Sequence, residues 1–147
     1  MQRVIIRHKP PSRGWLPLQI TVAGRSIEID ASDVPNNPVQ DLIEAIDRAA
    51  SGLESRVWWH LEPDGCFMYF TPVSNLVQFR LEFAPDSKRG ASQTVFAIQG
   101  SRAEMLLPFW RFLREFQSHS YTEPDWPAVN YERILVIKEK IQAVQVG

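Results

Sequence analysis

The densest set of reactive side chains lies within residues 60–66 and comprises His60, Glu62, Asp64 and Cys66. His60 and Glu62 are two residues apart in a segment with strand-like alternation, so one face would carry an imidazole and a carboxylate able to orient it for acid–base chemistry. Cys66 follows across a turn, where His60 could activate its thiol. Asp64 and Gly65 are also ordinary turn residues, and a single cysteine is commonly a small core residue. We therefore assign no catalytic residue and keep this site as an alternative.

The sequence contains no motif typical of a metal-binding or nucleotide-binding site. The histidines, His8, His60 and His119, are far apart, and no spacing typical of a zinc site occurs. No glycine-rich loop joins a strand to a helix, which removes the common nucleotide-binding fingerprints. We predict neither a metal nor a cofactor.

The composition predicts one globular domain over residues 1–147. Hydrophobic residues make up 44% of the chain and charged residues 22%, enough apolar material for a single core. A net charge of −1 argues against nucleic acid as a partner. Cys66 is the only cysteine, and no apolar run approaches the roughly 20 residues of a membrane span, so we expect a soluble cytoplasmic protein without a membrane partner.

Charge is unevenly distributed along the chain. Residues 1–15 carry four basic side chains and no acidic one, and we expect them to form a flexible arm or an edge strand. Residues 28–64 hold nine acidic side chains against Arg48 and Arg56. Such asymmetry can steer a charged partner.

The elements that must position these groups follow from periodicity. Alternation predicts a hairpin over residues 16–22 and 27–30 and further strands at 57–61, 66–71, 77–83 and 94–98. Asn37, Pro38 and Gln40 are typical of a helix start, so a helix is expected over residues 38–49.

A second helix should open at the capping box of Ser101 and Glu104 and run to about residue 117, with Pro108 kinking or dividing it. A third segment fits a helix, although residues 134–137 fit a strand equally well. This order predicts a two-layer α+β domain, an antiparallel sheet of about five to six strands (hairpin, helix, meander) with two to three helices packed on one face.

Aromatic side chains offer a binding surface. Trp58 lies on the opposite strand face from Trp59, while Tyr121 and Trp126 occupy a proline-containing connector. Tryptophan and tyrosine bury much area with few rotatable bonds, as anchors at interfaces do. The rival use is a small-ligand pocket, which would need inward polar groups such as those of Tyr69, Gln78 and Arg80.

Three stretches of the chain carry a resemblance to known proteins. They are PVQDLIEAI at residues 38–46, WWHLEPDG at 58–65, which a strand meander follows, and FWRFL at 109–113. Together they resemble small bacterial immunity proteins encoded beside polymorphic toxins, or uncharacterised α+β proteins of the same architecture. The resemblance implies a non-catalytic protein that neutralises a partner by binding it, and an acidic middle would suit a basic toxin.

We therefore predict that the chain is a non-catalytic protein–protein interaction protein. Its carboxylates would steer the partner and its aromatic side chains would anchor it. An edge strand or exposed aromatic side chains would also allow a homodimer. The alternative is an enzyme or small-molecule-binding protein with its site near His60, Glu62 and Cys66. The predicted partner-binding residues are Asp33, Asp41, Glu44, Asp47, Trp58, Tyr121 and Trp126.

Overall fold

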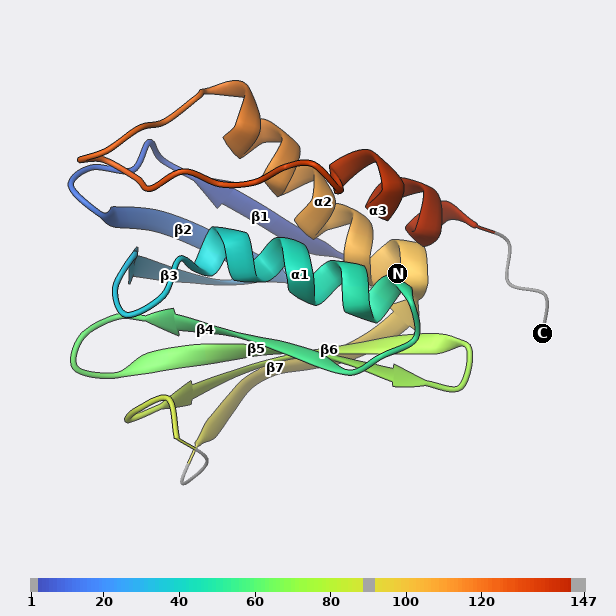
Figure 1. The fold of residues 1–147 in the computed structure, drawn as a ribbon. Coiled ribbons are helices and arrows are strands. Elements are labelled where there is room, and N and C mark those ends of the chain that lie inside the picture. The colour runs from blue at the N-terminus through green and yellow to red at the C-terminus, as the bar shows by residue number, and fades with distance from the viewer. Residues whose placement is uncertain (1–2, 89–91, 144–147) are drawn as a thin grey trace.

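The protein has an α+β fold built on one antiparallel sheet. The computed structural model describes residues 3–88 and 92–143, and within these residues the sheet has seven strands that lie side by side in chain order (Figure 1). The strands are β1 (Val4–His8), β2 (Trp15–Val22), β3 (Arg25–Ser32), β4 (Ser55–His60), β5 (Gly65–Val73), β6 (Leu76–Ala84) and β7 (Gln93–Ser101). The helices in the same residues are α1 (Pro38–Ala50), α2 (Arg102–Ser118) and α3 (Ile134–Gln142).

The predicted fold class is confirmed, with slightly more strands than expected. The hairpin, the meander and the first two helices form at the predicted segments. The additional strand is β1, which lies within the segment expected to be an arm or an edge strand and pairs with β2 at one edge of the sheet.

The core lies between the sheet and the helices, and α2 is central to it. Both edge strands, β1 and β7, contact α2, so the sheet curves around this helix. Leu106, Phe109 and Leu113 of α2 have no exposed surface. Alternation supplies the sheet side of the core, since the side chains on one face of β2 are all buried, namely Leu16, Leu18, Ile20 and Val22. We call the opposite face of the sheet the open face.

The sheet opens between β3 and β4. In the described part of the chain these strands pair at Ser32 and His60 alone, and beyond that pair they diverge (Figure 1). The chain between them forms α1, which packs on β4 and β5. The buried hydroxyl of Ser55 at the start of β4 donates to the carbonyl of Ala45 in α1 at 2.7 Å, which ties the two elements together.

Local sequence signals set the start of α1 and of α2. The Asn37 side chain accepts a hydrogen bond from the Gln40 amide at 3.3 Å. Ser101 and Glu104 form the expected capping box, with each side chain accepting from the other residue's backbone. Pro108 lies inside the second helix, as predicted. Of the two effects expected of it, a kink or a division, the division does not occur, because α2 continues through it to Ser118.

The ambiguous segment at residues 134–137 is helical. Ile134, Ile137 and Ile141 are buried at helical spacing, whereas Leu135 and Val136 between them are 61% and 41% exposed. A strand would have buried alternate residues instead. The helix is held against α2 by Trp110, whose indole N–H donates to the Ile134 carbonyl at 2.7 Å.

Candidate partner-binding surface

His60, Glu62 and Cys66 do not come together. His60 lies on the open face, where its Nδ1 accepts a hydrogen bond from the Trp58 indole at 3.2 Å. Cys66 pairs with Trp59, and both belong to the core on the other face of the sheet. Glu62 is exposed in the turn after β4. The imidazole is thus oriented by an indole rather than a carboxylate, and the sheet separates it from the thiol.

The Cys66 thiol is placed where it cannot react readily. It has no exposed surface, and burial, with a smaller contribution from the negative charge of Asp64, raises its pKa from 9.0 to about 12. Three pKa units mean roughly a thousandfold less thiolate at neutral pH. We expect the folded protein to resist a thiol-specific disulfide reagent at pH 8, and the protein in denaturant to release one equivalent of chromophore at once. Rapid stoichiometric labelling of the folded chain would contradict this placement.

The four carboxylates expected to steer a partner differ in what they contact. Asp47 is held within the molecule, because Arg133 and Lys140 approach its carboxylate to 2.8 and 2.7 Å. Partial burial alone would raise the pKa of Asp47, but hydrogen bonds and positive charge from these two residues outweigh it and lower the pKa below its usual value. Its charge is therefore largely compensated by α3 and the residue before it.

Asp41 and Glu44 remain available on the outer side of α1. Asp41 accepts one hydrogen bond from the Asn36 amide at 2.8 Å. Glu44 is exposed, and its side chain has no hydrogen bond or ion pair with any described residue. Asp33 lies apart, in the loop before α1, where its backbone N–H donates to Gly14 at 2.9 Å. Two of the four carboxylates thus lie on one helix without a salt bridge to any described residue, in the neighbourhood of Arg48 and Arg56.

Trp58 belongs to a small aromatic cluster on the open face, formed by Trp58, Phe67 and Tyr69. The rings of Trp58 and Phe67 are 4.8 Å apart and those of Phe67 and Tyr69 5.5 Å apart. Trp58 and Phe67 are buried, with 8% and 4% of their surface exposed, and Tyr69 is half-buried, so Tyr69 offers the larger accessible part of the cluster. Guanidinium groups cover two of the rings, with Arg56 5.0 Å from the Phe67 centroid and Arg80 4.2 Å from that of Tyr69.

Glu82 fixes the position of Arg80 over Tyr69. Its carboxylate forms an ion pair with Arg80 and accepts a hydrogen bond from the Ser92 hydroxyl at 2.7 Å. Burial opposes ionisation of Glu82, yet the hydrogen bonds from Ser92 and Arg80 and the positive charge outweigh it and lower its pKa. Tyr69, Gln78 and Arg80 lie on the open face of the sheet, where Tyr69 and Arg80 line a shallow hollow.

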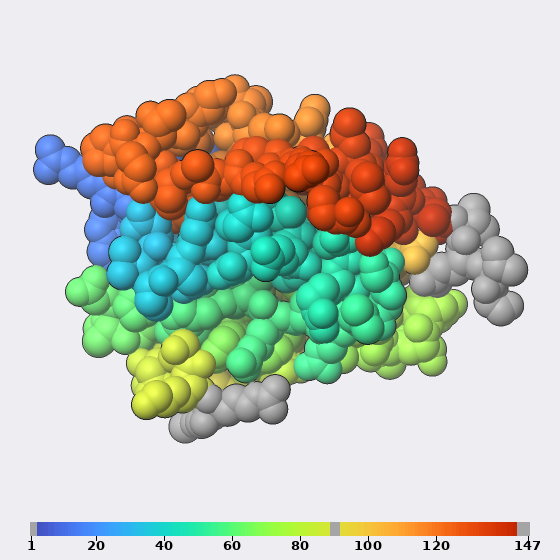
Figure 2. All heavy atoms as spheres, in the orientation of Figure 1, coloured from blue at the N-terminus to red at the C-terminus, as the bar shows by residue number. Residues whose placement is uncertain are grey.

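Two shallow hollows connect the charged side of α1 with the aromatic cluster. One, of about 350 Å³, lies between α1 and β4 and is lined by Asp41, Glu44 and Glu54 together with Arg48 and Arg56. The other, of about 320 Å³, is lined by Glu54, Phe67 and Tyr69 together with Arg80 and Lys88. The helix itself, drawn in cyan, is open to solvent between the orange-red C-terminal segment and the green strands in Figure 2. We call Asp41, Glu44, Glu54, Trp58, Phe67 and Tyr69 the acidic–aromatic surface.

The connector residues Tyr121 and Trp126 serve the interior more than the surface. Trp126 is completely buried, and its indole N–H donates to the Asn37 side chain at 3.2 Å, so it is closed to a partner in this conformation. Tyr121 is half-buried and packs on Phe116 with ring centroids 4.9 Å apart.

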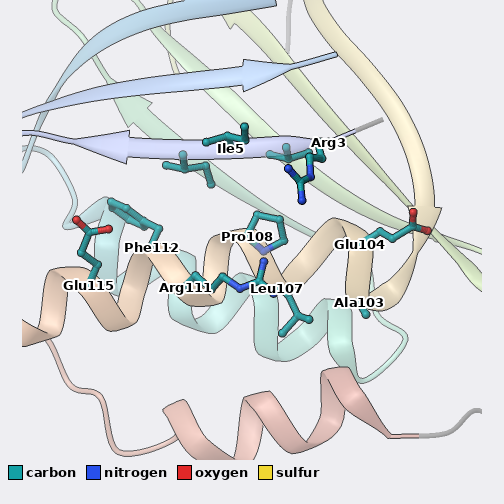
Figure 3. A pocket seen from close by; sticks show the side chains of 11 residues that line it. Arg3, Ile5, Ala103, Glu104, Leu107, Pro108, Arg111, Phe112 and Glu115 are labelled. Carbon is teal, nitrogen blue, oxygen red and sulfur yellow. The ribbon is translucent and has the colours of Figure 1, made fainter. Parts of the chain in front are cut away.

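Periodicity did not reveal a groove between β1 and α2 (Figure 3). It has a volume of about 430 Å³ and is lined by backbone and side chains of β1 and by one flank of α2. Pro108 and Phe112 face the strand, and Arg3 extends toward the helix. The two elements are about a hundred residues apart in the chain, so nothing local in the sequence joins them.

Comparison of the chain with protein-family models, curated proteins and solved structures finds no match. Among residues 3–88 and 92–143, no group of three or more His, Cys, Asp or Glu side chains is placed to hold a metal ion. The helices in the described part of the chain are each too short or too polar to cross a membrane.

Proposed function

We propose that this chain is a non-catalytic protein–protein interaction protein of the bacterial immunity type, which neutralises a basic partner by binding it. The observation that carries the proposal is the acidic–aromatic surface. There, the carboxylates of Asp41 and Glu44, which form no salt bridge with a described residue, adjoin through Glu54 an aromatic cluster that the fold already holds in place. Arg48 and Arg56 line the same hollow, so the three carboxylates there exceed the basic side chains by one.

The carboxylates and the aromatic cluster of this surface would act at different stages of binding. Exposed carboxylates on one side of a helix attract a basic partner over about a Debye length and raise its rate of association. The aromatic cluster would form the desolvated centre of the contact, because Tyr69 and Arg80 are ordered before binding and lose little conformational freedom on contact.

Asp47, also among the predicted partner-binding residues, would have a smaller role in binding. Asp47 would contribute mainly by holding α3 to α1 through Arg133 and Lys140, since its charge is already paired. We place the protein in the cytoplasm, where an unpaired reduced cysteine such as Cys66 is ordinary. A homodimer through an edge strand or through exposed aromatic side chains would be compatible with this role.

Affinity capture tests the proposal. The immobilised wild-type protein is exposed to a lysate of the cell that encodes it, beside a variant carrying Asp41→Lys and Glu44→Lys. Since like charges would then meet, we expect one basic protein to be retained stoichiometrically by the wild type and about tenfold less by the variant. Retained proteins are quantified by mass spectrometry.

A matched control separates this surface from net charge. Glu28 and Asp30 are exposed on β3, so the variant with Glu28→Lys and Asp30→Lys changes the net charge equally at another site. The control should retain the partner as the wild type does. Equal loss from both variants, or no basic protein retained by the wild type, would reject the proposal.

A further inference from the structure

β1 presents an unpaired backbone edge. Its ladder with β2 includes hydrogen bonds from the Lys9 amide to Pro17 and from the Ala23 amide to Arg3. Because hydrogen bonding alternates along an antiparallel strand, the residues between those bonded to β2 direct their N–H and C=O groups away from it. These residues are Val4, Ile6 and His8, and no described backbone group pairs with that edge.

A groove runs beside this edge. Its far wall is a flank of α2 that extends over residues 103–115, about 18 Å by the helical rise. That length matches about five residues of an extended strand. The apolar part of the wall consists of Leu107, Pro108 and Phe112 (Figure 3). The edge and the groove together have the shape of a site for one added strand.

The charges nearest the edge are mostly positive. Glu28 and Asp30 line a hollow with Arg7 and Lys9, but they lie on β3, two strands away from β1. Arg3, Arg7, Lys9 and Arg111 form no ion pair with any described residue. Glu104, at one end of the groove, is already engaged as the capping-box partner of Ser101, whose amide it binds at 2.9 Å. The groove lining itself is balanced, with Arg3 and Arg111 against Glu104 and Glu115. Arg7 and Lys9, on and beside β1, add the positive excess next to the position of an added strand, and this excess favours a negatively charged occupant.

We propose that the free edge of β1 binds an extended acidic segment of a partner protein as an additional strand of the sheet. Side chains alternate between the two faces of a strand. On the helix side the added strand would place apolar residues against Leu107, Pro108 and Phe112. On the open face it would place carboxylates beside Arg7 and Lys9, which are exposed there. This site is separate from the acidic–aromatic surface and does not depend on the function proposed for it.

Amide exchange provides the test that is specific to strand addition. The probe is a blocked heptapeptide in which glutamate and valine alternate, added to the isotope-labelled full chain and followed by NMR. The amides of Ile6 and His8 face away from β2 and should become protected, while those of Ile5 and Arg7, already bonded to β2, should change little. Docking of side chains alone would not produce this period of two.

Two comparisons test the chemistry. The charge variant Arg7→Glu with Lys9→Glu alters exposed side chains, so the fold should persist, and affinity for the peptide should fall about tenfold or more. A peptide with lysine in place of glutamate should bind the wild-type protein at least as weakly as the glutamate peptide binds the charge variant. Peptide binding without protection of Ile6 and His8, equal binding of both peptides, or occupation of the edge by a second copy of this chain would overturn the proposal.

Discussion

Replacing Gly65 by alanine should lower the free energy of unfolding by about 3 kcal/mol, as overpacking against fixed neighbours does. A Cβ atom at this position would lie 2.3 Å from Cζ2 of Trp58, 2.5 Å from its Cη2 and 2.6 Å from the Trp59 carbonyl oxygen. The Trp58 indole packs on Phe67, with ring centroids 4.8 Å apart, and the Trp59 carbonyl belongs to the β4 backbone, so neither neighbour is a flexible side-chain end. Urea unfolding followed by circular dichroism measures the change.

Gly24→Ala is the matched control for this substitution. Gly24 lies in the turn between β2 and β3 at a φ of +80°, and a Cβ there would meet no atom within 4 Å. Alanine at this position adds backbone strain of about 1 kcal/mol but no collision. A loss at Gly65 no larger than that at Gly24 would show that Trp58 does not lie fixed across β5.

Truncating Phe109 to alanine should lower the free energy of unfolding by about 3–5 kcal/mol, a large part of the stability of a typical domain. Phe109 is completely buried in α2, and its ring packs 4.9 Å from that of Phe70 and 5.0 Å from that of Phe79. The cavity would open where the curved sheet meets its central helix. Equilibrium denaturation and a thermal melt both report the loss.

Leu135→Ala removes an aliphatic side chain of the neighbouring helix, α3, as the control. Leu135 is 61% exposed, so its truncation should change stability by less than about 0.5 kcal/mol. A similar loss from both variants would mean that Phe109 is not at the centre of the core.

Local signals predicted α1 and α2 well because the deciding contacts are short in sequence. Asn37 caps α1 through Gln40, and Ser101 caps α2 through Glu104, each within three residues. Strand alternation likewise predicted which face of β2 and of β6 is buried, since a strand buries every second residue whatever its neighbours are.

Contacts between distant segments decided the rest. Sequence alone could not assign residues 134–137, because whether Leu135 is exposed depends on where α3 meets α2. His60 and Cys66 seemed able to cooperate across a turn, but the pairing of β4 with β5 places Cys66 opposite Trp59 and so on the other face. Trp126 lies in a polar connector, and its burial depends on distant residues, since its ring packs on Phe116 of α2 and its indole N–H donates to the Asn37 side chain before α1.

The sequence predicted that the candidate surface would be acidic, but not which of its carboxylates would be free of ion pairs. The acidic character of residues 28–64 is evident from the sequence. Which carboxylates remain available is not, because Asp47 is compensated by Arg133 and Lys140, 86 and 93 residues further along the chain. The aromatic cluster was equally hidden, since Trp58 meets Phe67 only through the cross-strand register.

The most direct measurement of the proposed function is the association rate of the captured basic partner, followed by stopped-flow fluorescence as ionic strength rises from about 0.01 to about 0.15 M. The wild-type rate should fall steeply with salt. The variant Asp41→Asn with Glu44→Gln should associate about tenfold more slowly at low salt and with a shallower dependence. Identical rates and slopes for the two proteins would contradict steering by α1 and with it the proposed role of the acidic–aromatic surface.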